Sequence, residues 1–449
     1  MDKIKQYIKE NNERFLDELF SLIRIPSIST KEGHEKDIIA CAEKYIELLK
    51  KAGVDSAKLL KTEGNPIIYA EKIVSKDLPT ALIYAHYDVV DVDGQNWLSD
   101  PFSPEIRDGK IWARGADDDK GQGFMHVKAF EYIIKEEKLP FNVKFIIEGE
   151  EEIGSKNFTQ FCKNNKELLK ADFAMVSDTT MINSETPCVM TGLRGIVSWN
   201  ITVKGAKQEV HSGHYGGAIV NPINELCRII AALKNQDNQI SIPNFYDDVI
   251  SYNEEERKHL QETPLDKKSL EDAGITKFEG EKGFETIEHI GIRPSLDVLE
   301  ISGGFGGNKI PKIASAKISC RLVPLQDKNI IGKLMIDHIN KIKSKNVDVE
   351  VKFNDGENPY HSRMIEVPYI NIAEKAYQKV YGMKPYDKKN GGSIGAITIL
   401  YNELGLKSLV MGFGLSSDVI HGADENYPLS QFFNGIETII YFYKYFSVN

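Results

Sequence analysis

The sequence predicts an α/β fold in which a mainly parallel central sheet is covered by helices. Short apolar runs, each ending in polar residues, occupy positions 81–84, 143–147, 173–176 and 408–413. Runs of this length are typical of strands that are buried on both faces. Helical patterns lie between them, as at 121–137 and 369–381, and such alternation favours parallel strands joined by helices.

The chain opens with an amphipathic helix. Its apolar residues recur at helical spacing and are Phe15, Leu16, Leu19, Phe20 and Ile23. This spacing places them on one face, which is available to pack against the sheet.

The middle of the chain has a different pattern, which predicts an inserted α+β domain. Strands are expected at 195–203, 296–301, 316–322 and 347–353, and helices after Asn221-Pro222 and at 330–342. Asn and Pro are favoured as the N-cap and first residue of a helix. Residues 237–290 are polar with weak periodicity, and we interpret them as an elaboration of the insert. The main domain then comprises residues 1–187 and 357–449, and the insert comprises residues 188–356.

The composition excludes several classes of protein. The 449 residues include 56 Lys and Arg against 66 Asp and Glu, a net charge of −10. A general nucleic-acid binder would need a basic face, so no nucleic-acid partner is expected. The five cysteines are scattered without a CxxC pair, which favours reduced thiols. Because no apolar run is long enough to span a membrane and the first residues are too charged for a signal peptide, we expect a cytoplasmic protein without a membrane partner.

Histidines and carboxylates follow five predicted strands, at the point where each strand ends. They are His86 and Asp88, Asp117 to Asp119, Glu150 to Glu152, Asp178, and His421. In open α/β sheets, ligands bind beyond the carboxyl ends of the strands. Five such ends in succession therefore indicate a metal site.

The number of ligands predicts two metal ions. Two imidazoles and three carboxylates are too many for one tetrahedral zinc. We assign His86 and Asp178 to one ion and Glu152 and His421 to the other, with Asp118 bridging both. Zinc is the expected metal, and manganese and cobalt are the alternatives. Two ions that share a water can ionise it and polarise a carbonyl.

Two further carboxylates are expected to assist the metals. Asp88 lies two residues after His86, so a strand would place both on one face, where Asp88 holds the imidazole in its metal-binding tautomer. Glu151 precedes the ligand Glu152. A carboxylate that is free of the metals but beside their water is what a general base requires.

The sequence also contains the motifs H-Y-D-V-V at 86–90, A-R-G-A at 113–116, D-D-K-G at 118–121, E-G-E-E-E-I-G-S at 148–155, G-L-R-G at 192–195, H-S-G at 211–213, R-L-V-P at 321–324 and G-G-S-I at 391–394. As a set they resemble the motifs of the two-zinc amidohydrolase and dipeptidase family, metallopeptidase family twenty, which includes carnosinase, glutamate carboxypeptidase and acetylornithine deacetylase. The resemblance is greatest to carnosinase-like cytosolic dipeptidases. It implies a zinc-peptidase-like catalytic domain that is interrupted by a lid, and such lids often dimerise.

The resemblance implies the same metal ligands, the same supporting carboxylate Asp88 and the same general base Glu151. It also implies roles for four further residues. It implies that His211 of the lid reaches a partner subunit's site and stabilises the oxyanion. It also implies that Asn308, Arg321 and Ser393 hold the substrate's carboxylate or its neighbouring amide. The residues alone leave other interpretations open: His211 as the cap of a turn, Arg321 in a structural ion pair, and Ser393 as ordinary loop chemistry.

The substrate-facing region departs from the carnosinase pattern, whereas the metal set does not. Asn308 stands where carnosinases usually have Thr, residues 388–390 read Lys-Lys-Asn where they tend to have an Arg-Glu pair, and Gly395 replaces the usual Pro. Substrate identity is therefore the open question.

We expect a metallodipeptidase that hydrolyses the amide bond of dipeptides or short peptides with a free C-terminal carboxylate. A water bridging two metals would lose its proton to Glu151, and Arg321 would anchor the carboxylate. The expected partners are a small peptide and a second copy of the chain, joined through the lid. Deacylation of N-acyl amino acids at the same site is the alternative, and a non-catalytic binding protein on this fold is a remote one.

Overall fold

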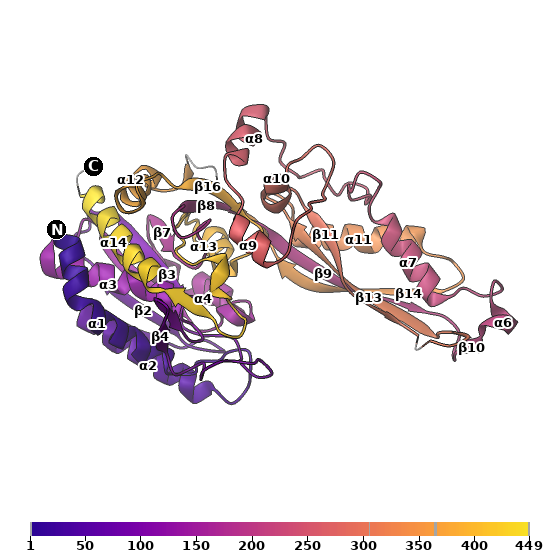
Figure 1. The fold of residues 1–449 in the computed structure, drawn as a ribbon, viewed down its shortest axis with the longest axis horizontal. Helices are drawn as coiled ribbons and strands as arrows, with labels where there is room; N and C mark the ends of the chain where they lie inside the picture. Colours follow the sequence, from indigo (N-terminus) through magenta and orange to yellow (C-terminus); the bar gives the residue numbers. More distant parts are fainter. Residues whose placement is uncertain (1, 305, 363–365, 448–449) are drawn as a thin grey trace.

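The chain forms a rounded α/β part from which a long arm projects (Figure 1). The computed structural model describes residues 2–304, 306–362 and 366–447. The rounded part contains a nine-stranded sheet, and the arm contains a four-stranded sheet. Within the described ranges, no helix combines the length and the apolar character that crossing a bilayer requires.

The nine-stranded sheet is mixed. Its strands in spatial order are β1 (Ser56–Leu60), β2 (Ile67–Lys72), β6 (Asn142–Glu148), β3 (Thr80–His86), β7 (Phe173–Val176), β17 (Ser408–Val410), β8 (Cys188–Leu193) and β15 (Tyr360–His361), with β16 (Tyr386–Asn390) also paired to β8. The central strands β6, β3, β7 and β17 are parallel, whereas β2 pairs with β6 and β17 with β8 in antiparallel fashion.

The α/β class is confirmed, and the prediction of a mainly parallel sheet holds for the centre. At the flanks the strands are not parallel as predicted. For example, β1 and β2 are joined by a short connection and pair as antiparallel neighbours. A short connection cannot join parallel strands, which need a crossover.

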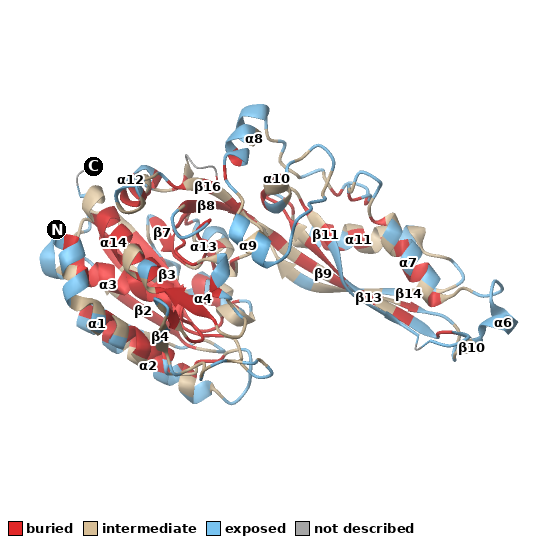
Figure 2. Ribbon diagram, viewed as in Figure 1, coloured by how far each residue is buried: buried red, intermediate tan, exposed pale blue. Residues whose placement is uncertain are grey.

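Helices cover both faces of this sheet. One face packs against α1 (Lys3–Ile23), α2 (Glu35–Ala52), α3 (Lys120–Glu136), α12 (Ile370–Tyr381) and α14 (Leu429–Phe446), and the other against α4 (Phe158–Asn164), α5 (Lys166–Leu169) and α13 (Gly395–Leu404). Successive residues of β3 alternate between the two cores: Ile83 belongs to the first, and Leu82 and Tyr84 belong to the second. This alternation explains why the strand reads as a continuous apolar run. Figure 2 shows the resulting buried layer.

The predicted helices begin and end close to where their signals lie. The helix predicted at 121–137 is α3, and the one predicted at 369–381 is α12, which ends at Tyr381 and is capped by Gly382 with φ 78°. Glycine is favoured at this position because it adopts a left-handed backbone without a steric penalty.

The arm is a sheet with helices on one face. Its strands in spatial order are β11 (Ser295–Gly303), β13 (Ile313–Leu322), β9 (Gly195–Lys204) and β14 (Asp348–Glu357), and all neighbours are antiparallel. Helices α7 (Pro222–Ala232) and α11 (Lys328–Ile342) pack on it around the buried Trp199. Asn221 caps α7 as predicted, because its side chain accepts a hydrogen bond from the backbone N–H of Ile223. Residues 237–290 contribute α8 (Glu254–Gln261), α9 (Lys267–Asp272) and α10 (Thr286–Gly291).

The change from one sheet to the other occurs at Arg194. Strand β8 still pairs within the nine-stranded sheet, and β9 begins the arm at Gly195. The chain therefore changes sheet six residues after position 188, where we place the start of the insert (194 − 188 = 6). The division into 1–187, 188–356 and 357–449 stays a prediction.

Candidate metal centre

The predicted ligands come from five different segments of the rounded part. His86 ends β3, Asp178 follows β7, Glu152 lies on the 3-10 helix η1 (Glu151–Ile153) after β6, and His421 lies in the loop after η3 (Ser416–Asp418). Asp118 directly precedes the start of α3, next to its N-cap. One expectation is wrong: the strand before Asp118 is β5 (Lys110–Trp112), which pairs with β4 (Glu105–Arg107) and β18 (Asn426–Pro428) in a separate three-stranded sheet. A short apolar run does not reveal which sheet it joins.

Asp118 lies between the two histidines. Its Oδ1 is 2.9 Å from Nε2 of His86, and its Oδ2 is 2.9 Å from Nε2 of His421. Glu152 Oε2 is 3.0 Å from the same nitrogen of His421, and Asp178 Oδ2 is 3.9 Å from Nε2 of His86. Each oxygen of Asp118 therefore faces a different imidazole.

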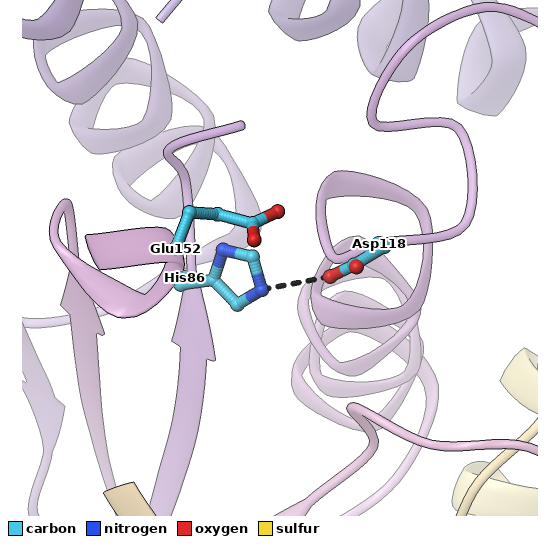
Figure 3. Close-up of side chains that lie close together, drawn as sticks. All are labelled: His86, Asp118 and Glu152. Atoms are coloured by element: carbon cyan, nitrogen blue, oxygen red, sulfur yellow. Dashed lines mark hydrogen bonds and ion pairs between the residues drawn. The ribbon is translucent and has the colours of Figure 1, made fainter. Parts of the chain in front are cut away.

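These donors suit divalent cations. Ligand atoms of His86, Asp118 and Glu152 lie within 4.8 Å of one another (Figure 3). Imidazole nitrogen and carboxylate oxygen are the ligands that zinc and its neighbours bind in proteins. The group in Figure 3 contains His86 and Glu152, which we assign to different ions. The contacts of Asp118 favour that assignment, because a bridging carboxylate must offer one oxygen to each ion.

A second set of contacts orients His86. Its Nδ1 lies 3.1 Å from the backbone carbonyl oxygen of Asp88 and 3.4 Å from Oδ1 of the same residue. Donation from Nδ1 leaves Nε2 free to act as a ligand. Asp88 is itself held, because its Oδ2 accepts hydrogen bonds from the Ser29 hydroxyl (2.6 Å) and the backbone N–H of Glu152 (3.2 Å).

Glu151 lies beside the ligands without joining their contacts. Its backbone N–H donates to Asp88 Oδ1 over 3.3 Å. Within the described part of the chain, no hydrogen bond reaches its carboxylate. Burial raises the pKa of Glu151 well above the usual range. A carboxylate with a raised pKa is suited to accept and release a proton near neutral pH.

The charges of the cluster depend strongly on one another. Burial raises the pKa of Glu152 to about 7 and that of Asp178 to about 6. Hydrogen bonds to Asp118 and Glu152 raise the pKa of His421 to about 10. Burial also opposes the charged form of Asp118, but the hydrogen bonds from both histidines outweigh it and lower the pKa of this carboxyl. Burial thus opposes the negative charge of these carboxylates, and a positively charged partner beside them offsets that cost, as the imidazoles do here and divalent cations would do when bound.

A residue that the sequence analysis missed supports the loop of Asp118. Glu425 is fully buried and accepts hydrogen bonds from Arg114 Nη1 (2.7 Å) and from the backbone N–H groups of Gly115 (2.9 Å), Asp117 (3.1 Å) and Asp118 (3.2 Å). Glu425 lies in the sequence near His421, so it joins the two loops. An acidic residue four positions after a proposed ligand was the available signal.

Asp119, the residue after Asp118, supports the backbone of His86. The peptide bond between Asp118 and Asp119 is cis. Asp119 Oδ2 accepts a hydrogen bond from the backbone N–H of His86 over 3.1 Å. The Asp119 side chain is buried and thereby fixes the backbone of His86 from inside the protein.

Two predicted residues lie far from this cluster, at the tip of the arm. His211 ends β10 (Val210–His211), which pairs with β12 (Lys309–Ile310) beside α6 (Ser212–Tyr215), at the opposite end of the molecule from β3 (Figure 1). Its Nδ1 accepts a hydrogen bond from the N–H of Gly213, 3.0 Å away. The carbonyl of Asn308 accepts from the N–H of Ser212 over 2.8 Å, so Asn308 lies next to His211. The chain does not bring either residue to its own metal ligands.

Arg321 and Ser393 lie nearer the junction of the two parts. Arg321 is near the end of β13, opposite Ile196, where the arm meets the large sheet. Ser393 is in the loop between β16 and α13. Arg194 joins these regions, because its side chain donates to the carbonyls of Gly391 (3.2 Å) and His289 (3.1 Å). The substrate-binding roles of Arg321 and Ser393 stay predictions.

Known proteins share this fold and sequence. The chain is 28% identical to a Cys-Gly metallodipeptidase of Schizosaccharomyces pombe, over 97% of this chain and 96% of the relative. It is 28% identical to the human Beta-Ala-His dipeptidase, over 99% of this chain and 92% of that relative. The structure matches an M20 family metallo-carboxypeptidase from Sulfolobus solfataricus with a TM-score of 0.84 and 28% identity, over 97% of this chain and 99% of the other.

The family model for peptidase family M20/M25/M40 matches residues 82–444, a range that contains every proposed metal ligand. The chain therefore belongs to peptidase family M20/M25/M40 and is a hydrolase of peptide bonds.

Proposed function

We propose that this enzyme is a dipeptidase that cleaves dipeptides or short peptides with a free C-terminal carboxylate and uses two divalent metal ions. The observation that carries the proposal is the position of Asp118 between His86 and His421, with Glu151 free beside them. The relatives named as a Cys-Gly metallodipeptidase and a Beta-Ala-His dipeptidase support the choice of a dipeptide substrate.

The ions would be held in two overlapping sets of ligands. His86 and Asp178 would hold one, Glu152 and His421 the other, and Asp118 both. Zinc is the proposed metal, with manganese and cobalt as alternatives. When bound, such a pair lowers the pKa of a water and polarises a carbonyl.

The side chains divide the remaining work. Glu151 takes a proton from the attacking water and later passes it to the leaving amine. Asp88 keeps His86 oriented. Arg321 pairs with the substrate's terminal carboxylate, for which a guanidinium is well shaped. Ser393, and Asn308 from a second copy of the chain, would hold the substrate's carboxylate or its neighbouring amide.

A second copy of the chain would complete the site. His211, at the tip of the arm, would stabilise the oxyanion in the partner's site. The edge strand β11 supports dimerisation through the arm, because Val298, Leu299 and Ile301 are 40%, 60% and 54% exposed on it. An exposed apolar edge strand is a ready pairing surface.

The cytoplasm is the proposed location. All five cysteines are free, and four of them are buried. Unpaired thiols are typical of proteins that work in a reducing compartment.

The replacement Glu151→Gln tests the mechanism. We expect metal affinity to stay unchanged, because Glu151 is not a ligand, while kcat falls by about a hundred- to ten-thousandfold, the usual contribution of a general base. Calorimetric metal titration and dipeptide hydrolysis measure the two effects. Residual turnover within tenfold of wild type would remove Glu151 from this role. Activity that a chelator abolishes and zinc restores would exclude a non-catalytic protein.

The replacement Arg321→Ala tests the carboxylate anchor. It should mainly raise KM for peptides with a free carboxylate and leave peptide amides unaffected. An unchanged KM would reject the anchor. Assaying N-acetyl amino acids beside dipeptides separates this function from the alternative, deacylation.

A further inference from the structure

A cavity of about 250 Å³ lies between the rounded part and the elaboration of the arm. Thr180, Ser416 and the end of β16 line one side of it. The other side consists of aliphatic residues from the segment that holds α9 and α10, and they are Leu265, Leu270, Ile287 and Ile290.

Two residues that line the cavity are neighbours of proposed metal ligands along the chain. Thr180 follows the proposed ligand Asp178 by two residues, and Ser416 lies in the segment that leads to His421. The Cγ2 atom of Ile290 is 3.4 Å from the point where a side chain on Gly391 would begin. Gly391 opens the loop that contains Ser393, so the cavity borders the loop of this predicted substrate-binding residue.

Several polar groups around the cavity already have partners inside the protein. Lys388 Nζ donates to the Thr180 hydroxyl (3.2 Å), and the Thr263 hydroxyl donates to the carbonyl of Asp387 (2.9 Å). Asp266 accepts from the backbone N–H of Ser269 (3.2 Å) at the start of α9. Beside these groups the lining is largely aliphatic, and it includes Ile182.

We propose that this cavity receives an apolar side chain of the substrate and so determines specificity. The inference rests on the proposed peptidase function and names the class of substrate, peptides that carry an aliphatic or aromatic residue. Ligand pockets are typically concave and apolar with a few oriented polar groups, as here. Moving a leucine-sized side chain out of water into such a pocket corresponds to about a ten- to hundredfold gain in kcat/KM.

The test compares wild type with Ile290→Trp, which fills the cavity, and with Ile275→Trp as the matched control. Ile275 lies in the same segment, is 45% exposed against 38% for Ile290, and does not line the cavity. The substrates are dipeptides with Gly, Ala, Leu, Phe or Glu at each position, together with the N-acetyl derivatives of the same amino acids.

We expect wild type and I275W to prefer Leu over Gly about ten- to hundredfold at one position. I290W should reduce this ratio below about threefold while leaving kcat/KM for the Gly substrates unchanged. Leu270→Ala enlarges the cavity and should shift the preference from Leu toward Phe. If I290W unfolds at a lower temperature than wild type, the substrate preference of Leu270→Ala decides whether the cavity binds the side chain.

An unchanged Leu-to-Gly ratio in I290W, or an equal loss for all substrates, would overturn the proposal. If wild type cleaves only the N-acetyl series, the dipeptidase function fails and the same ratios test the cavity on that series. If wild type cleaves neither series, calorimetric titration with free leucine and glycine decides: binding of leucine to wild type and I275W but not to I290W supports the cavity, and any other pattern rejects it.

Discussion

Glu425 is a buried side chain that positions Asp118, a proposed metal ligand, from outside the proposed ligand set. Its carboxylate accepts a hydrogen bond from the Arg114 guanidinium and from three backbone N–H groups, the last of which belongs to Asp118. Hydrogen bonds to a charged acceptor are stronger than neutral ones, and burial strengthens them further. The loop of Asp118 is therefore tied to the loop of His421 before any cation binds.

Replacing this carboxylate by an amide should separate the two loops. In Glu425→Gln one oxygen acceptor becomes an NH2 donor that faces other donors, so we expect the free energy of unfolding to fall by about 3–5 kcal/mol and metal affinity to fall with it. Urea unfolding and calorimetric metal titration measure the two effects. Glu105→Gln is the control, since Glu105 is 41% exposed in the same small sheet and should change stability by less than about 0.5 kcal/mol. A Glu425→Gln protein as stable as this control would contradict the supporting role.

At the scale of elements, a buried ionic cluster joins α1 to α3. Glu18 on α1 and Glu131 on α3 share the ammonium of Lys128, and Arg14 Nη2 lies 2.8 Å from Glu131 Oε1. Burial opposes the charge on Glu131, but hydrogen bonds from Arg14 and Lys128 outweigh it and lower the pKa of Glu131 to about 2. A buried charge needs such partners, because an unpaired one is strongly destabilising.

This depressed pKa predicts how stability depends on pH. The contribution of the Glu131 charge is complete above the usual pKa of about 4.5 and is lost as the pH falls toward 2, since the unfolded chain then binds the proton more tightly. At pH 7 the free energy of unfolding of wild type should exceed that of Glu131→Gln by roughly 3 kcal/mol. This difference in stability should shrink between pH 4.5 and 3. Urea unfolding at stepped pH measures it. The control Glu136→Gln removes a half-exposed carboxylate of α3, where we expect less than about 1 kcal/mol. A difference that stays constant from pH 7 to 3 would refute the linkage.

At the scale of the whole molecule, the arm separates residues that we assign to one reaction. His211 lies at its tip and the metal ligands lie in the rounded part, so one chain alone does not assemble the proposed site (Figure 1). Symmetric dimers commonly solve this problem by exchanging equivalent surfaces, and the exposed edge of β11 offers one.

Mixing two inactive variants tests this exchange. Glu151→Gln and His211→Ala should each be nearly inactive as homodimers. After dissociation and random reassociation, half of the dimers are mixed and each mixed dimer has one intact site, so about a quarter of the wild-type rate should return. The control pairs Glu151→Gln with Asp178→Asn, which both lie in the same part and should give no recovery. Absence of recovery in the first mixture would show that His211 does not act across the dimer.

The elements that the sequence predicted correctly depend on short stretches of chain. The apolar run before His86, the helical spacing of α3 and the Asn-Pro start of α7 each carry their signal within a few residues, because periodicity and capping are local properties. The choice of metal-ligand residue types is local in the same sense, since an imidazole or a carboxylate at a strand end is visible in the sequence.

The features that the sequence left open depend on contacts between distant segments. Glu425 and Gly115 are 310 residues apart, yet one carboxylate oxygen joins them. The assignment of β5 to a separate sheet, the antiparallel flanks of the large sheet and the distance of His211 from its own metal ligands have the same origin. The sequence by itself therefore determined which chemical groups stand at each position. Which of these groups contact one another was decided only by the tertiary structure, because hydrogen bonds and strand pairing act over a few ångströms and join segments that are remote in the sequence.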